Sequence, residues 1–208
     1  MPAAKRQTTS SYDVHPSLAM FQSSLAGLKQ KTGRSLEEWL VFVDKEGPAT
    51  EKERRAWLKT KHGLGMNYAW WIAERSVGKG DDGTPETYLK NADEYVQAMY
   101  SGAKESLRPI FDELLALGRN LGKDVRVCPC QTMVPLYRKH VFAQIKPTTR
   151  TRIDLGLALK DTKVPKRLID TGGFAKKDRI THRIEITSLK DIDAEVKKWL
   201  KTAYDMDR

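Results

Sequence analysis

The fold class is decided by residues 125–161, which have the sequence VRVCPCQTMVPLYRKHVFAQIKPTTRTRIDLGLALKD. Apolar and polar side chains alternate from 141 to 145 and again from 149 to 157, with the period of two that is typical of strands with one buried face. Residues 133–137 and 179–187 add two further predicted strands. The chain is therefore predicted to be α+β, with a mainly antiparallel sheet of four or five strands.

The two central strands carry basic side chains whose positions depend on the register. If their apolar faces match, a three-residue loop that includes Pro147 joins them, because a slip of one residue would turn one face outward. Lys146 would then lie opposite Arg150, and Gln144 opposite Arg152. Like charges that face each other across strands are unfavourable, and a bound anion is one explanation for them. The alternative is that the long basic side chains spread into water.

The charge of the chain is concentrated in the same region. The 208 residues carry a formal net charge of +10. Residues 125–183 contain 14 Lys and Arg against four Asp and Glu, whereas the remainder contains 23 of each sign. Such a localised excess is typical of proteins that bind nucleic acid or another polyanion, although proteins that bind neither also show it.

The sequence excludes several other classes. It has no apolar run of the length that spans a bilayer, and residues 1–16 are polar, without the apolar core of a secretory signal. We expect a disordered tail there and a cytoplasmic protein. Cys128 and Cys130 flank one proline, and His140 and His182 are the candidate partners for a metal site with them. Structural metal sites need three or four ligands in a recognisable spacing, so we expect reduced thiols, no metal and no cofactor.

Helical signals dominate residues 17–78, for which we predict a four-helix domain. One helix spans 17–33, and Ser35 and Thr50 each begin a capping box with a glutamate three residues later. Four tryptophans are expected to supply much of the burial in so small a core: Trp39, Trp57, Trp70 and Trp71. Residues 79–84, rich in Gly and Asp, form the predicted linker.

The α+β domain is expected over residues 85–208. Apolar spacing predicts helices at 85–100 and 104–121, and a final helix that Asp191 caps. A short helix is expected at 165–170, within a segment that is rich in lysine and arginine.

The turn at Gly63-Leu64-Gly65 resembles that of a helix-hairpin-helix motif, because the pattern G-h-G-x-x-x-A continues to Ala69. In that motif, amides at the start of the second helix hold a phosphate. The alternative is a glycine-rich turn between two packed helices, with Ala69 small enough to allow their close approach.

Longer resemblances cover nearly the whole chain after the tail. Residues 17–77, with KTGRSLEEWL, AWLKTKHGLG and NYAWWIA, resemble a short helical domain of bacterial proteins that has no known function. Residues 85–205, with VPLYRKHVFAQIKPTTRTRIDLGLAL and ITHRIEITSLKDIDAEVKKWLKTAY, resemble a second uncharacterised domain of α+β fold that often accompanies the first. The resemblance implies no catalytic residues.

We interpret the chain as a non-enzymatic module that binds an anion, with nucleic acid the first expectation and its oligomeric state open. Phosphate contact requires only cations and exposed amides, and Tyr137, Phe142 and Phe174 are candidates to stack on bases. The candidate binding residues are Arg138, Lys139, His140, Lys146, Arg150, Arg152, Lys176, Lys177, Arg179 and Arg183, with Gly63 and Gly65.

Two alternatives remain. One is a regulatory module for a small molecule or a protein, with a pocket that Tyr137, Arg138, His140 and Arg152 line. The other, ranked last, is a metal-dependent enzyme. The chain has no nucleophile elbow and no Walker loop, and its acids Asp154 and Glu185 are single residues on separate predicted strands.

Overall fold

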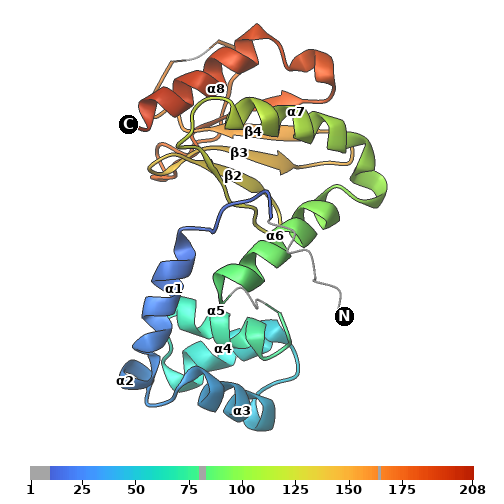
Figure 1. The fold of residues 1–208 in the computed structure, drawn as a ribbon. Helices are drawn as coiled ribbons and strands as arrows, with labels where there is room; N and C mark the ends of the chain where they lie inside the picture. The colour runs from blue at the N-terminus through green and yellow to red at the C-terminus, as the bar shows by residue number, and fades with distance from the viewer. Residues whose placement is uncertain (1–9, 80–82, 164) are drawn as a thin grey trace, which may run out of the picture. The chain divides into compact units, whose positions relative to one another are not determined.

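The chain folds as an α+β protein, as predicted, with helices first and an antiparallel sheet with helices after them (Figure 1). The computed structural model describes residues 10–79, 83–163 and 165–208. These residues form two compact units. The helical unit consists of residues 14–88, and the sheet unit consists of residues 89–208 together with the described residues before 14. Of the predicted linker 79–84, residues 80–82 lie outside the described residues, as do residues 1–9 of the predicted tail.

The helical unit has five helices where four are predicted, because Gly27 divides the first one. The helices are α1 (Ser17–Ala26), α2 (Leu28–Thr32), α3 (Leu36–Glu46), α4 (Glu51–His62) and α5 (Met66–Arg75). Both predicted capping boxes are confirmed. In the first, the Ser35 hydroxyl accepts from the Glu38 amide at 3.2 Å, and the Glu38 carboxylate accepts from the Ser35 amide at 2.7 Å.

The core of the helical unit is aromatic. Trp39 is buried, and its indole N–H donates to the Thr32 hydroxyl at 2.8 Å. The ring centroids of Trp57 and His62 are 4.3 Å apart, and burial lowers the pKa of His62. Trp70 contributes less than predicted, since it is 42% exposed. The helical spacing that places Ala69, Ile72 and Ala73 in the core turns Trp70 toward solvent.

The sheet unit contains six strands in the order β1-β2-β3-β4-β6-β5, all antiparallel. They are β1 (Arg126–Val127), β2 (Val134–Tyr137), β3 (Val141–Pro147), β4 (Ile153–Leu157), β5 (Ile169–Asp170) and β6 (His182–Ile186). The helices of this part of the chain are α6 (Pro85–Met99), α7 (Arg108–Arg119) and α8 (Ala194–Met206), with the short 3₁₀ helices η1 (Gly102–Leu107) and η2 (Leu189–Asp191). The unit boundary, between residues 88 and 89, falls within α6.

Two short elements differ from the prediction. The short helix expected at 165–170 is wrong: residues 169 and 170 are β5 and pair with β6. Two-residue strands such as β1 and β5 are too short to show a period of two in the sequence. Asp193 rather than Asp191 caps α8, and its carboxylate accepts from the amides of Glu195 and Val196. Asp191 instead accepts from the amides that precede it, at Thr187 and Ser188.

The predicted register between the central strands is also wrong. Lys146 pairs with Asp154, not Arg150, and Ile145 pairs with Leu155, so residues 148–152 form a five-residue connection. Both registers match the apolar faces because they differ by an even number of residues. The observed register avoids the like charges that the predicted one would place opposite each other across the strands.

Helices α7 and α8 contact β3 and cover one face of the sheet (Figure 1). The buried residues of β3, β4 and β6 on this face include Ile145, Leu155 and Ile184. The alternation along 141–145 predicts Phe142 on the same face as Gln144, and Phe142 is also a candidate to stack on bases. In the structure it is fully buried, and its ring centroid lies 5.5 Å from that of Tyr204 on α8. The pairing of β2 with β3 shifts close by, between Leu136 and Tyr137, and such irregularities redirect side chains.

The described end of the predicted tail is attached to the sheet unit. The Asp13 amide donates to the Val127 carbonyl at 2.8 Å, and the Val127 amide donates to the Asp13 carboxylate at 2.7 Å. None of the helices in the described part of the chain has the length and apolar character that a membrane crossing requires.

Candidate functional site

The antiparallel topology places two basic loops at the same end of the sheet. The turn at 138–140 leads into β3, and the loop at 171–181 leads into β6. Both strands begin beside the end of β4, because Leu157 pairs with Ala143 on one side and with His182 on the other. We call this region the basic end, and it consists of Arg126, Arg138, Lys139, His140, Lys176, Lys177 and Arg179.

The carboxylate of Asp207 joins the two loops. Its side chain is 4% exposed and accepts three hydrogen bonds. The donors are the His140 amide at 2.8 Å, the His140 ring Nδ1 at 3.0 Å and the Arg179 guanidinium at 2.6 Å. Burial alone would raise the pKa of Asp207, but these hydrogen bonds outweigh it and lower the pKa. Asp207 therefore remains ionised and holds a residue of each loop.

A second carboxylate fixes Arg138. Asp124 accepts from the Tyr204 hydroxyl at 2.6 Å and from the Arg138 guanidinium at 2.7 Å. The same guanidinium lies 4.3 Å from the centroid of the Tyr204 ring. The hydrogen bond from Tyr204 and, to a smaller extent, that from Arg138 lower the pKa of Asp124. Arg138 is therefore oriented by an acid and an aromatic ring, both outside the predicted site.

The loop at 171–181 is closely packed at its base. A Cβ on Gly173 would lie 2.3 Å from the Ile180 carbonyl oxygen, so only glycine fits there. The Asp178 amide donates to the Gly173 carbonyl at 2.8 Å, which closes the loop. Its tip presents Phe174, which is 56% exposed, together with the exposed Lys176 and Lys177.

Three lysines of the basic end are open to a partner. Lys139, Lys176 and Lys177 are exposed, and within the described ranges no carboxylate lies within ion-pair distance of their amines. Arg138 and Arg179 each have a carboxylate partner. Arg138 and Arg179 are therefore held in place by acids, and the three lysines supply the positive charge of the basic end that no carboxylate of the described residues compensates.

The basic face of the strands, by contrast, is internally neutralised. Arg152 lies 3.0 Å from Asp154 and 2.8 Å from Glu185, and Arg183 lies 3.1 Å and 2.7 Å from the same two acids. The charges of Arg152 and Arg183 are therefore compensated within the sheet unit by these two acids. Arg150 is exposed in the connection after β3.

The pocket predicted from Tyr137, Arg138, His140 and Arg152 is not assembled. Arg152 immediately precedes β4, whose other end approaches the turn at 138–140. Lys146 also lies away from the basic end. It lines a separate hollow near the end of β3.

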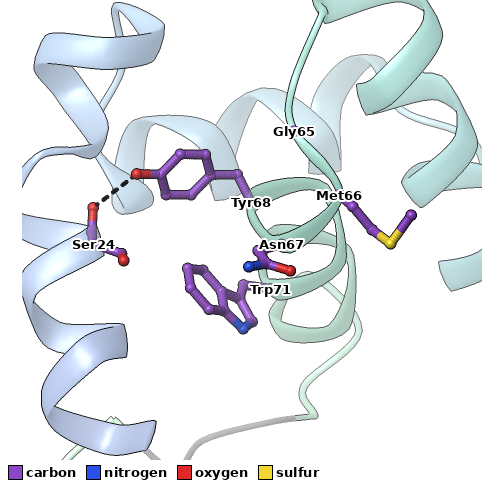
Figure 2. Close-up of a pocket in the computed structure, with 6 residues that line it drawn as sticks. All are labelled: Ser24, Gly65, Met66, Asn67, Tyr68 and Trp71. Carbon is purple, nitrogen blue, oxygen red and sulfur yellow. Dashed lines mark hydrogen bonds between the residues drawn. The ribbon is translucent and has the colours of Figure 1, made fainter. Parts of the chain in front are cut away.

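The glycine turn of the helical unit joins α4 to α5. Gly63 ends α4 with φ +66°, a left-handed conformation that favours glycine, and Gly65 precedes the first residue of α5. A hollow of about 330 Å³ lies beside this helix start, and Figure 2 shows the residues that line it. Tyr68 and Trp71 project toward α1, and the Tyr68 hydroxyl donates to the Ser24 carbonyl at 3.3 Å. This turn belongs to the helical unit, whereas the basic end belongs to the sheet unit.

The cysteines lie in the connection between β1 and β2. Cys128 is buried, and burial raises the pKa of its thiol to about 12. His140 is bound to Asp207, and the ring of the buried His182 lies 2.9 Å from the Thr181 hydroxyl. In the ranges that the structure describes, His, Cys, Asp and Glu side chains form no cluster of three or more that is suited to a metal ion.

The residues that organise the basic end were not among the predicted site residues. Tyr204 and Asp207 lie more than 20 residues after the basic stretch 125–183, and Asp124 immediately precedes that stretch. Only folding brings these three residues to Arg138, His140 and Arg179. The apolar spacing of the last helix predicts that Ala203 faces inward, which indicates that its C-terminal end packs against the sheet. Nothing in the sequence indicates what the side chain of Asp207, just after this helix, binds.

Comparisons with known proteins identify both parts of the chain. The family described as Domain of unknown function (DUF5655) matches residues 96–207. A second family, Domain of unknown function (DUF4287), matches residues 20–75. Neither the curated proteins nor the solved structures include a match to the chain.

Proposed function

The chain belongs to the family described as Domain of unknown function (DUF5655), a description without an activity, and we propose from its geometry that it binds nucleic acid through the basic end. The observation that carries this proposal is the shared carboxylate of Asp207, which holds His140 of one basic loop and Arg179 of the other. Two segments that lie about 40 residues apart in sequence thereby form one surface. Such a surface matches a phosphate backbone, which binds arrays of cations irrespective of sequence.

The three open lysines are the expected phosphate contacts. Lys139 belongs to one loop, and Lys176 and Lys177 belong to the other, so a bound strand would contact both. An ammonium group is a compact cation that binds phosphate without requiring a fixed geometry. This chemistry suits backbone contact and carries no base recognition, so we expect little sequence preference.

Phe174 favours unpaired over paired strands. Its ring is more than half exposed at the tip of the second loop, beside Lys176 and Lys177. An exposed aromatic ring next to cations is the usual platform for an unstacked base, and such stacking contributes about 1 to 3 kcal/mol per base. A base within a duplex offers no free face to this ring, so a single strand is the expected partner.

The test is fluorescence anisotropy with labelled single-stranded DNA, duplex DNA and RNA, measured across a salt series. The lysine variant Lys139→Gln/Lys176→Gln/Lys177→Gln is compared with the control Lys52→Gln/Lys190→Gln/Lys197→Gln. The control removes the same charge from exposed lysines elsewhere. The slope of log affinity against log salt is negative, and we expect the lysine variant to reduce its magnitude by about 2 to 3, because about 0.7 to 0.9 counterions are released per phosphate contact.

The control should leave that slope unchanged, and Phe174→Ala should weaken single-strand binding more than duplex binding. An equal loss in the two triple variants would show that only net charge matters. That result, or the absence of binding at low salt, would contradict the proposal.

A further inference from the structure

A hollow of about 480 Å³ lies in the sheet unit, at the end of β3 where Lys146 pairs with Asp154. The turn at 138–140 lies at the other end of this strand. Four segments form the walls: the last turn of α6, the helix η1, the connection between β1 and β2, and the end of β3. The residues that line the hollow include Met99, Lys104, Gln131, Thr132, Lys146 and Thr148.

The walls are held in place by hydrogen bonds. The Lys104 amine donates to the Pro147 carbonyl at 2.7 Å, which fastens η1 to the end of β3. The Thr148 hydroxyl donates to the Asp154 carboxylate at 2.8 Å, and the Thr148 amide donates to the Arg152 carbonyl at 3.1 Å. In the connection between β1 and β2, the Cys130 amide donates to the Met133 carbonyl at 2.9 Å. The hollow is therefore formed by fixed segments of the fold, as ligand sites usually are.

The polar lining is cationic. Two amines, those of Lys104 and Lys146, border the hollow, and no carboxylate does. In the described part of the chain, no carboxylate lies within ion-pair distance of either amine. The nearby Asp154 is engaged by Arg152, Arg183 and Thr148. The Thr132 hydroxyl and the amide of Gln131 add neutral hydrogen-bonding groups, whereas the Thr148 hydroxyl already donates to Asp154.

We propose that this hollow binds the phosphate monoester of a small organic molecule. A phosphate monoester carries a charge of about −1.5 to −2 near neutral pH, which matches the two ammonium groups. Its three oxygens can accept from amines and hydroxyls together, and lysine is a common phosphate ligand. Met99, which is buried in the core beneath, and Pro147 supply an apolar wall for the organic part.

This site goes beyond the proposed nucleic-acid surface and is independent of it. It uses none of the residues of the basic end. The two proposals are therefore separable, since each has lysines that the other lacks.

The test is isothermal titration of the full chain with phenyl phosphate, and with benzoate and phenol as a monoanion and a neutral molecule of similar shape. Phenyl phosphate should bind more tightly than benzoate, and phenol should not bind. Lys146→Gln should weaken phenyl phosphate about tenfold, which is the loss expected for one hydrogen bond to a charged group. The control Lys139→Gln at the basic end should leave it unchanged.

A second measurement does not depend on a lysine variant. The chain contains six methionines, and the methyl resonance of Met99, assigned with Met99→Leu, should shift when phenyl phosphate is added. Three results would overturn the proposal: no binding at up to about 10 mM, equal weakening by Lys139→Gln, or an unmoved Met99 signal at saturation. Lys146→Gln should also leave nucleic-acid affinity unchanged, so failure of one proposal does not imply failure of the other.

Discussion

The Arg179 guanidinium donates to the Asp207 carboxylate at 2.6 Å, and this contact ties the loop before β6 to the end of α8. Asp207 lies just after that helix, and it also binds the turn before β3 through His140. One buried acid near the C-terminus thus positions two loops whose exposed cations point to solvent. A basic surface in this protein is organised by a negative charge.

Replacement of this acid should loosen both loops. Asp207→Ala leaves the His140 amide and the Arg179 guanidinium without their buried acceptor, and we expect a loss of about 2 kcal/mol in the free energy of unfolding. Urea denaturation measures this. Asp205→Ala is the matched control, because Asp205 interacts with the exposed Lys201 on the same helix. A loss as large for Asp205→Ala would contradict the role assigned to Asp207.

The pH dependence of stability should report the same acid. The folded-state pKa of Asp207 is lowered from the ordinary value of 3.8, so its stabilising contribution is fully present above that value. The contribution is lost as the pH falls through the folded-state pKa. Asp207→Asn cannot titrate, so its unfolding free energy should depend less on pH below about 4 than that of the unmodified protein. Parallel profiles in urea denaturation at a series of acidic pH values would contradict this.

The two arginines near the start of β4 should behave differently. Arg152→Glu would place a third acid beside Asp154 and Glu185, and we expect it to cost about 1 to 3 kcal/mol of stability. Arg150→Glu, on an exposed residue of the preceding connection, should change the stability by about 0.5 kcal/mol or less. Thermal denaturation distinguishes them. Equal melting temperatures would show that the ion pairs of Arg152 with Asp154 and Glu185 do not contribute to stability.

The glycines of the turn between α4 and α5 have unequal roles. Gly63 has φ +66°, so Gly63→Ala should cost about 1 to 2 kcal/mol through left-handed backbone strain. Gly65 has ordinary φ, and no atom lies within 4 Å of a Cβ placed there. Gly65→Ser should therefore be tolerated, since serine is a favourable N-cap residue for α5. The loss of helical signal on heating measures both, and a larger loss for Gly65→Ser would contradict this explanation.

Much of the fold could be predicted because it depends on local pattern. The capping boxes at Ser35 and Thr50, the end of α4 at Gly63 and the alternation along β3, β4 and β6 are all interactions between residues close in sequence. The register of β3 with β4 could not be predicted in this way. An even shift preserves the apolar faces, so the alternation along the two strands does not distinguish the predicted register from the observed one.

The sequence by itself determined the α+β class, most of the helices, the main strands and the concentration of positive charge between residues 125 and 183. Only the tertiary structure decided which of those charges remain open. Arg152 and Arg183 are neutralised by acids on neighbouring strands, whereas Lys139, Lys176 and Lys177 are not. The reason is physical: the charge of a side chain is set by its own chemistry, but its neutralisation depends on partners that folding brings within a few ångströms.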